Sequence, residues 1–125
     1  MKKKTKYTVA AMVLVAIAIS IGFWHVNSYD RMEELRQEFS EEFEIAGATS
    51  RINIGSEIRE LRDIQDKLED MTVPPWAYEA RDHLNEGMEE TIQAFLSFQS
   101  QDDQAVTTHF SNAADEFEAY NSLIR

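Results

Sequence analysis

The sequence predicts an all-α protein with a single N-terminal transmembrane helix followed by an antiparallel helical bundle. Residues 7–26 form an apolar run without Asp, Glu, Lys or Arg, and a helix needs about 20 such residues to cross a bilayer. Beyond this run, apolar residues recur every three or four positions, which is the spacing of one helical face. No stretch after residue 28 alternates apolar and polar residues for long, as a half-buried strand would.

The N-terminal segment is expected to be a signal anchor in the cell membrane. Residues 1–6 read MKKKTK, and this basic tail predicts a cytoplasmic N-terminus with the following domain, residues 27–125, outside the cytoplasm. Tyr7 and Trp24 lie near opposite ends of the span and are predicted membrane-interface anchors. A cleaved signal peptide, which would give a secreted protein, is the alternative; however, the apolar run continues past the small residues that could form its cleavage site.

The first helix outside the membrane is expected to begin near residue 28. Its apolar stripe keeps spacings of three or four throughout, and its members are Met32, Leu35, Phe39, Phe43, Ala46, Ser50, Ile54, Ile58, Leu61, Ile64, Leu68 and Met71. This constant phase favours one long helix of about 43 residues, and hence a bundle of three helices. Gly47 and Gly55 each cost a helix about 1 kcal/mol relative to alanine. A break near residues 47–56, which would give four helices, is the alternative.

Both prolines of the chain lie in the stretch TVPPW, residues 72–76. Val73 precedes a proline and is therefore expected to end the first helix. Proline is tolerated in the first turn of a helix, so the next helix is expected to start directly afterwards. In this reading the stretch is a corner of the fold, and Trp76 lies back over Leu68 or Met71.

The last helix is expected to begin after the sequence SQDD, residues 100–103. Ser100 and Asp103 have the spacing of a capping box, with Asp in place of the usual Glu. The apolar residues that follow alternate in steps of four and three, and they are Val106, Phe110, Ala113, Phe117, Tyr120 and Ile124. This spacing predicts a helix that packs along one side, as in a coiled coil.

The charge of the chain is divided between its two parts. Residues 27–125 carry 8 basic and 23 acidic side chains, a formal charge of −15. Such a surface repels nucleic acid and anionic lipid, so no nucleic-acid partner is expected and a protein partner would be basic or neutral. The chain has no cysteine, which excludes disulfides, thiol catalysis and cysteine-ligated metals.

No catalytic, cofactor-binding or metal-binding residue is predicted, and the protein is not expected to be an enzyme. His83 could share a helix face with Glu79 and Glu86, but the Glu-x-x-His pattern of metal-binding bundles is missing. Phosphate-binding loops, nucleophile elbows and EF-hand loops are absent from the sequence. Four phenylalanines could line a small-ligand pocket between helices, although their spacing is that of core residues: Phe95, Phe98, Phe110 and Phe117.

The three-helix arrangement would leave part of the first helix uncovered near the membrane. Leu35, Phe39 and Phe43 would then form a possible partner-binding stripe, used by a second copy or by another membrane protein. With four helices the same residues are core. The predicted function is a membrane-anchored, non-enzymatic extracytoplasmic interaction or scaffold module. The alternatives are an accessory single-pass subunit of a larger membrane complex and a helical bundle that binds a small ligand.

Overall fold

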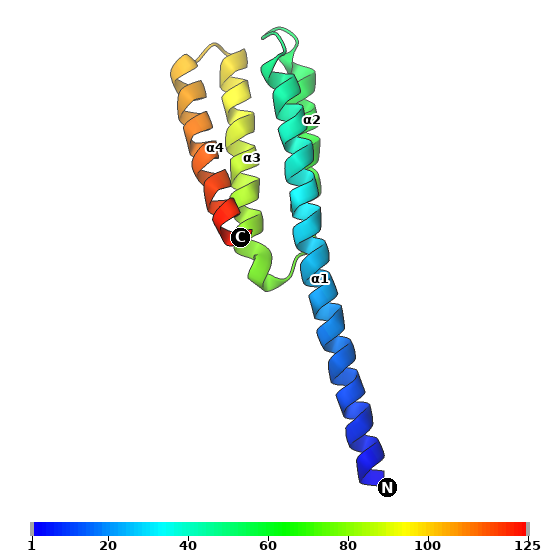
Figure 1. The fold of residues 1–125 in the computed structure, drawn as a ribbon. Coiled ribbons are helices and arrows are strands. Elements are labelled where there is room, and N and C mark those ends of the chain that lie inside the picture. Colours follow the sequence, from blue (N-terminus) through cyan, green and yellow to red (C-terminus); the bar gives the residue numbers. More distant parts are fainter. Residues whose placement is uncertain (1, 125) are drawn as a thin grey trace.

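The computed structural model describes the backbone of residues 2–124 and the side chains of residues 10–124. Within them the chain forms the helices α1 (Lys2–Gly47), α2 (Ile54–Glu69), α3 (Tyr78–Gln99) and α4 (Asp103–Ile124), and the short 3-10 helix η1 (Pro75–Ala77). The four helices run alternately up and down, and the first half of α1 projects from the bundle (Figure 1). The all-α class and the bundle that follows an apolar N-terminal helix are therefore confirmed.

The projecting part of α1 is apolar and exposed. Its residues 10–27 are all exposed, and α1 contains a stretch that is long and apolar enough to cross a membrane. Trp24 lies near the end of this stretch and is 38% exposed. The side chain of Tyr7, the other predicted interface anchor, lies outside the described residues.

The prediction of one long helix from residue 28 to the prolines was wrong, because the chain breaks between Gly47 and Ile54 and folds back. α1 ends at Gly47, one of the two weak helix formers, and the other, Gly55, lies in the first turn of α2. Asn53 stabilises the turn, since its backbone N–H donates to the carbonyl of Ser50 at 3.0 Å and its side chain donates to the Ser50 hydroxyl at 3.1 Å. Folding back buries both apolar stripes against each other, a gain that a straight helix cannot make.

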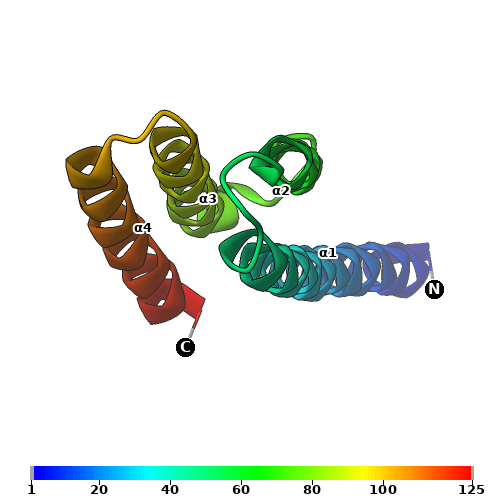
Figure 2. The same ribbon diagram turned by 90° about the horizontal axis from the view of Figure 1, so that it is seen from above.

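The core lies between the four helices along the upper half of α1. α2 packs against α1 and α3, and α3 packs most extensively against α4. Viewed from above, α4 lies beside α3 and away from α2 (Figure 2). The core consists mainly of aliphatic side chains, among them Met32, Leu35, Ile54, Leu61, Leu68, Leu84, Met88 and Ile92, all of them 0% exposed. The remaining side of the bundle, between α1 and α4, is packed less closely.

The prolines form the predicted corner. Pro74 is extended (φ −59°, ψ 151°), and Pro75 opens η1, which leads into α3. α2 ends at Glu69, four residues before the expected end at Val73. Trp76 reaches α1, where its indole N–H donates to His25 Nδ1 at 2.6 Å. Its contact with Leu68 or Met71 stays a prediction.

The N-terminal cap of α4 also differs from the prediction. The side chain of Asp102 accepts a hydrogen bond from the backbone N–H of Ala105 at 3.1 Å. Ser100, the expected cap, instead donates to the carbonyl groups of Leu96 and Ser97 at the end of α3. The acidic residue next to the helix start therefore satisfies a free backbone donor of α4.

Candidate functional site

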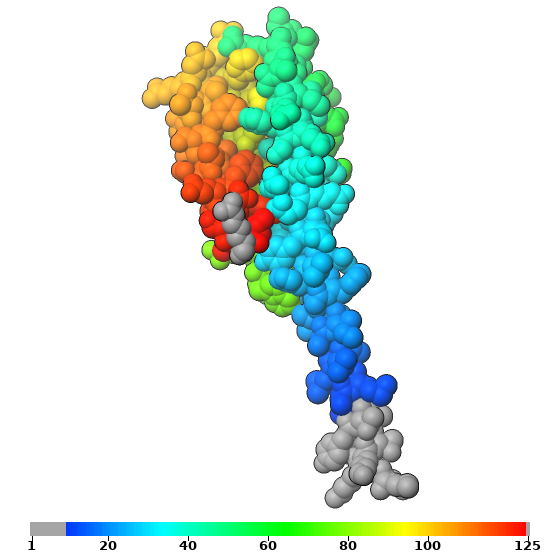
Figure 3. Space-filling model, in the orientation of Figure 1, coloured from blue at the N-terminus to red at the C-terminus, as the bar shows by residue number. Residues whose placement is uncertain are grey.

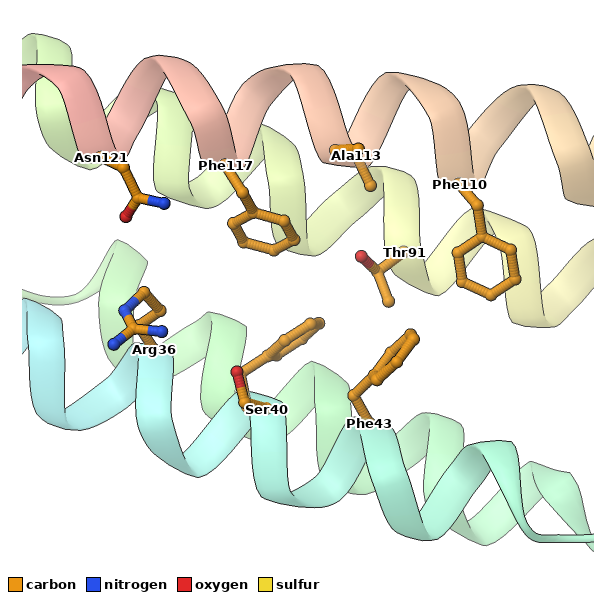
Figure 4. Close-up of a pocket in the computed structure, with 10 residues that line it drawn as sticks. Arg36, Ser40, Phe43, Thr91, Phe110, Ala113, Phe117 and Asn121 are labelled. Carbon is orange, nitrogen blue, oxygen red and sulfur yellow. The ribbon is translucent and has the colours of Figure 1, made fainter.

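A groove lined by phenylalanines runs between α1 and α4. Its larger cavity has a volume of about 350 Å³ and is bounded by Arg36, Phe39, Ser40, Phe43, Thr91, Phe110, Ala113, Ala114, Phe117 and Asn121. In the space-filling view α4 and the upper half of α1 lie side by side (Figure 3). The close-up shows Phe43, Phe110 and Phe117 pointing toward one another across the cavity, with Arg36 and Asn121 at one end (Figure 4).

A second cavity of about 310 Å³ continues the groove toward the distal end of the bundle. Phe43 and Phe110 line both cavities and lie between them. The ring centroids of these two residues are 5.9 Å apart at 87°, and each ring also packs on Phe95, at 5.7 and 5.6 Å. Edge-to-face pairs of this kind are favourable beyond the area they bury. The groove therefore has a well-packed aromatic floor at its centre.

The helix sequences explain why the rings meet at this side of the bundle. Phe39 and Phe43 are four residues apart and share one face of α1. Phe110 and Phe117 are seven residues apart and share one face of α4. Phe117 packs directly over α3 at Gly87, where a Cβ atom would lie only 2.8 Å from its ring. The absence of a side chain at Gly87 therefore lets α4, with the Phe117 ring, approach α3 closely.

A polar triad closes the groove at the end nearest the apolar part of α1, with Tyr120 buried and Glu33 and Arg36 partly exposed. The Tyr120 hydroxyl donates to Glu33 Oε1 at 2.6 Å, and Arg36 donates to Glu33 Oε2 at 3.0 Å. Burial raises the pKa of Glu33, but the hydrogen bonds from Arg36 and Tyr120 outweigh it and bring the pKa below its usual value. Burial and the neighbouring Glu33 carboxylate both raise the pKa of Tyr120. Glu33 is thus held as a carboxylate that ties the last turns of α4 to α1.

The structure places the predicted partner-binding stripe mainly in the core. Leu35 is 0% exposed and Phe39 is 3% exposed, so the uncovered stripe of the three-helix arrangement is absent. The physical reason is the fold-back of α2, which with α3 and α4 now covers this part of α1. Phe43 remains 38% exposed and lines the groove. Phe39 and Phe43 are therefore brought together at one site, while Leu35 lies away from its lining.

The four phenylalanines considered for a ligand pocket divide between core and groove. Phe95 is buried, whereas Phe110 and Phe117 are partly exposed and line the larger cavity. Phe98 lines the second cavity and carries the guanidinium of Arg51 over its ring at 4.8 Å. The sequence spacing could identify these residues but not which of them face an opening.

The two histidines of α3 and α4 form hydrogen-bond contacts between these helices. His83 Nδ1 lies 2.6 Å from Glu116 Oε2, and His109 Nδ1 lies 2.6 Å from Glu90 Oε2. Glu79 is farther from His83, at 3.9 Å. Among the described residues no group of three His, Cys, Asp or Glu side chains is placed to hold a metal ion. Both contacts join residues far apart in sequence, so helix periodicity alone gave no signal for them.

The groove is suited to binding apolar groups. Its only buried hydroxyl, on Thr91, already donates to the carbonyl of Gly87 at 2.8 Å. Arg36 and Asn121 offer polar groups at one end, and Ser40 of α1 adds a hydroxyl to the lining. A cavity of this volume falls within the range of about 300–1,000 Å³ seen for small-molecule sites.

Comparisons with protein-family models, curated proteins and solved structures give no match to this chain.

Proposed function

We propose that this protein is a membrane-anchored, non-enzymatic binding module that holds the four-helix bundle outside the cytoplasm and presents the α1/α4 groove to a partner protein. The observation that carries the proposal is the groove itself, which keeps phenylalanine rings accessible in an otherwise acidic domain. Accessible apolar surface of this kind is typical of interaction sites. The apolar part of α1 and the lysines that precede it support anchoring with the N-terminus in the cytoplasm.

The dimensions of the groove favour an amphipathic helix as the partner segment. The two cavities extend along α1 from Arg36 to Gly47, a length of about 16 Å at about 1.5 Å per residue. This length matches about three turns of a helix that inserts apolar side chains at positions i, i+4 and i+7. The formal charge of −15 on residues 27–125 favours basic or neutral residues on the outer face of such a helix. The partner could be one subunit of a larger membrane complex.

The test is to isolate the tagged full-length chain from its own membranes in mild detergent and to measure its native mass. Phe43→Asp places a charge in the centre of the groove at a partly exposed position. Ile52→Asp is the matched control, because Ile52 is 92% exposed in the α1–α2 turn and lies away from the groove. We expect the wild-type chain and Ile52→Asp to retain a protein at fixed stoichiometry and Phe43→Asp to lose it. Circular dichroism verifies that both variants remain folded.

Recovery of the same protein with Phe43→Asp would exclude the groove as the binding site.

A second candidate function, capture of a small apolar ligand, is favoured by the cavity volume of about 350 Å³. In that case the native mass would show the chain with a bound species of a few hundred daltons and no protein partner. Phe43→Asp would then lose that species instead.

A further inference from the structure

The proline corner contacts α1 at the point where its apolar stretch ends. Trp76 Nε1 donates a hydrogen bond to His25 Nδ1 at 2.6 Å, and Trp24 Nε1 donates to the carbonyl of Thr72 at 3.3 Å. The indole rings of Trp24 and Trp76 have centroids 6.4 Å apart at 67°. The corner and the end of the apolar stretch are thereby joined by two hydrogen bonds and an aromatic contact.

This end of the bundle exposes large apolar side chains. Trp76 is 51% exposed, Tyr78 is 47% exposed and Trp24 is 38% exposed. Leu123 of α4 is 41% exposed and lies beside His25 at the same end of the molecule. Residues 71–78 include no charged residue. The indole N–H groups of both tryptophans are satisfied within the protein, so their exposed ring surface is left to contact apolar surroundings.

The corner lies at the level that the outer lipid headgroups would occupy. The apolar run ends at residue 26, and Trp24 is two residues, or about 3 Å of helix, before that end. The contacts of Trp76 with Trp24 and His25 place its ring at nearly the same height. Trp and Tyr prefer this boundary because one part of the ring system is apolar and another part can form hydrogen bonds.

We propose that residues 71–78, with Trp76 and Tyr78 as anchors, form a second membrane contact that rests in the outer interface of the lipid bilayer beside α1. This inference rests on the anchoring proposed above and adds a part of the bundle that touches lipid. Continuity with the apolar stretch of α1 is what favours lipid over a protein as the occupant. A surface that adjoins a transmembrane segment at the depth of its own interfacial tryptophan is covered by lipid unless another protein displaces it.

The charges around the corner favour zwitterionic lipid. Asp30 and Glu79 are exposed near it, and Asp70 directly precedes it. Arg81 is engaged, because it donates to the carbonyl of Met71 at 3.0 Å. Anionic headgroups attract clusters of free basic side chains, and the corner offers no such cluster.

Two contacts with the bilayer, one through α1 and one through the corner, would hold the bundle at a fixed tilt to the membrane.

The test uses tryptophan fluorescence in phosphatidylcholine vesicles whose acyl chains carry bromine, which quenches indoles on contact. The full-length chain has two tryptophans, so Trp24→Phe reports on Trp76 alone and Trp76→Phe reports on Trp24 alone. A third variant, Trp24→Phe/Trp76→Phe/Ile52→Trp, places the only indole at a distal position that is 92% exposed in the wild type.

We expect Trp24 and Trp76 both to lose fluorescence to lipid bromine, more with bromine near the headgroup than near the end of the acyl chain. The indole at position 52 should keep its fluorescence and be quenched by acrylamide in the water instead. If Trp24 is quenched while Trp76 behaves like position 52, the membrane contact of the corner is overturned and the anchor stands. If Trp24 also escapes quenching, the anchoring proposal itself is overturned. Circular dichroism of each variant in vesicles verifies that the bundle is folded.

Discussion

The side-chain carboxyl group of Glu42, in α1, lies close to two acidic residues of α2, Glu57 and Glu60. Its Oε1 atom is buried and has no hydrogen-bond partner among the described residues. Burial, and then the nearby carboxyl groups of Glu57 and Glu60, raise the pKa of Glu42 to about 7. The folded protein therefore binds a proton at Glu42 at a pH where the unfolded chain has already released it.

This raised pKa predicts that the bundle loses stability as the pH rises. The folded state favours protonated Glu42, so its contribution is fully present below the unfolded pKa of about 4.5 and is lost as the pH rises through about 7. Glu42→Gln should remove this dependence and raise the free energy of unfolding at about pH 8 by about 1 kcal/mol, allowing for screening by water. Thermal unfolding of the full-length chain in detergent, followed by circular dichroism across this pH range, measures the effect.

The neighbouring residue Glu41 provides the matched control. Glu41→Gln removes the same charge at an exposed position of the same helix. It should keep the wild-type loss of stability between about pH 5 and about pH 8, because the proton bound at Glu42 is unchanged. Equal pH profiles for Glu42→Gln and the wild type would contradict the assignment of this dependence to Glu42.

At the scale of helices, Gly87 of α3 permits the close approach of α4. A Cβ atom at this position would lie 2.8–3.0 Å from three ring atoms of Phe117, closer than real Cβ contacts. At Gly55 of α2 an added Cβ atom would meet only the end of the Gln99 side chain, at 3.7 Å. The two glycines thus offer the same substitution with and without crowding.

Gly87→Ala should lower the free energy of unfolding by about 1 kcal/mol, because an overpacking cost of about 2 kcal/mol exceeds the helix-propensity gain of about 1 kcal/mol. Gly55→Ala should leave it unchanged or raise it by up to about 1 kcal/mol. In a Phe117→Ala background the crowding disappears, and Gly87→Ala should become stabilising. Urea unfolding of the wild type, the three single variants and Phe117→Ala/Gly87→Ala measures these differences. A stabilising Gly87→Ala in the wild-type background would show that Phe117 moves aside at no cost.

The helices themselves could be predicted from local patterns, whereas the break in the long helix could not. The apolar run, the three-to-four spacing and the proline corner each depend on residues near one another in the sequence. An apolar stripe keeps the same phase whether the helix continues past Gly47 or folds back onto the same core. Whether the helix continues or folds back depends on the free energy gained when the stripes of α1 and α2 are buried against each other. The spacing of apolar residues along the sequence carries no information about this gain.

At the scale of the whole molecule, the contacts that define the groove and the corner join distant parts of the chain. Tyr120 and Glu33 are 87 residues apart, and Trp76 and His25 are 51 residues apart. Each contact requires that α2 and α4 both run back toward the apolar part of α1, which follows from the break after Gly47. The phenylalanines of the groove were identifiable as apolar residues. Their exposure depends on how α4 packs on α3, and the sequence alone does not reveal it.

The orientation of the whole chain across the membrane gives the last prediction. Four of its basic residues lie in the first six positions, and all of its acidic residues lie beyond the apolar run, so the N-terminus should stay in the cytoplasm. Because the chain has no cysteine, single substitutions report one position each. In intact cells a membrane-impermeant maleimide should label Ile52→Cys, at the exposed distal turn, and should label Lys4→Cys only after lysis. Labelling of Lys4→Cys alone before lysis would reverse the orientation, and its failure to be labelled even after lysis would indicate a cleaved signal peptide.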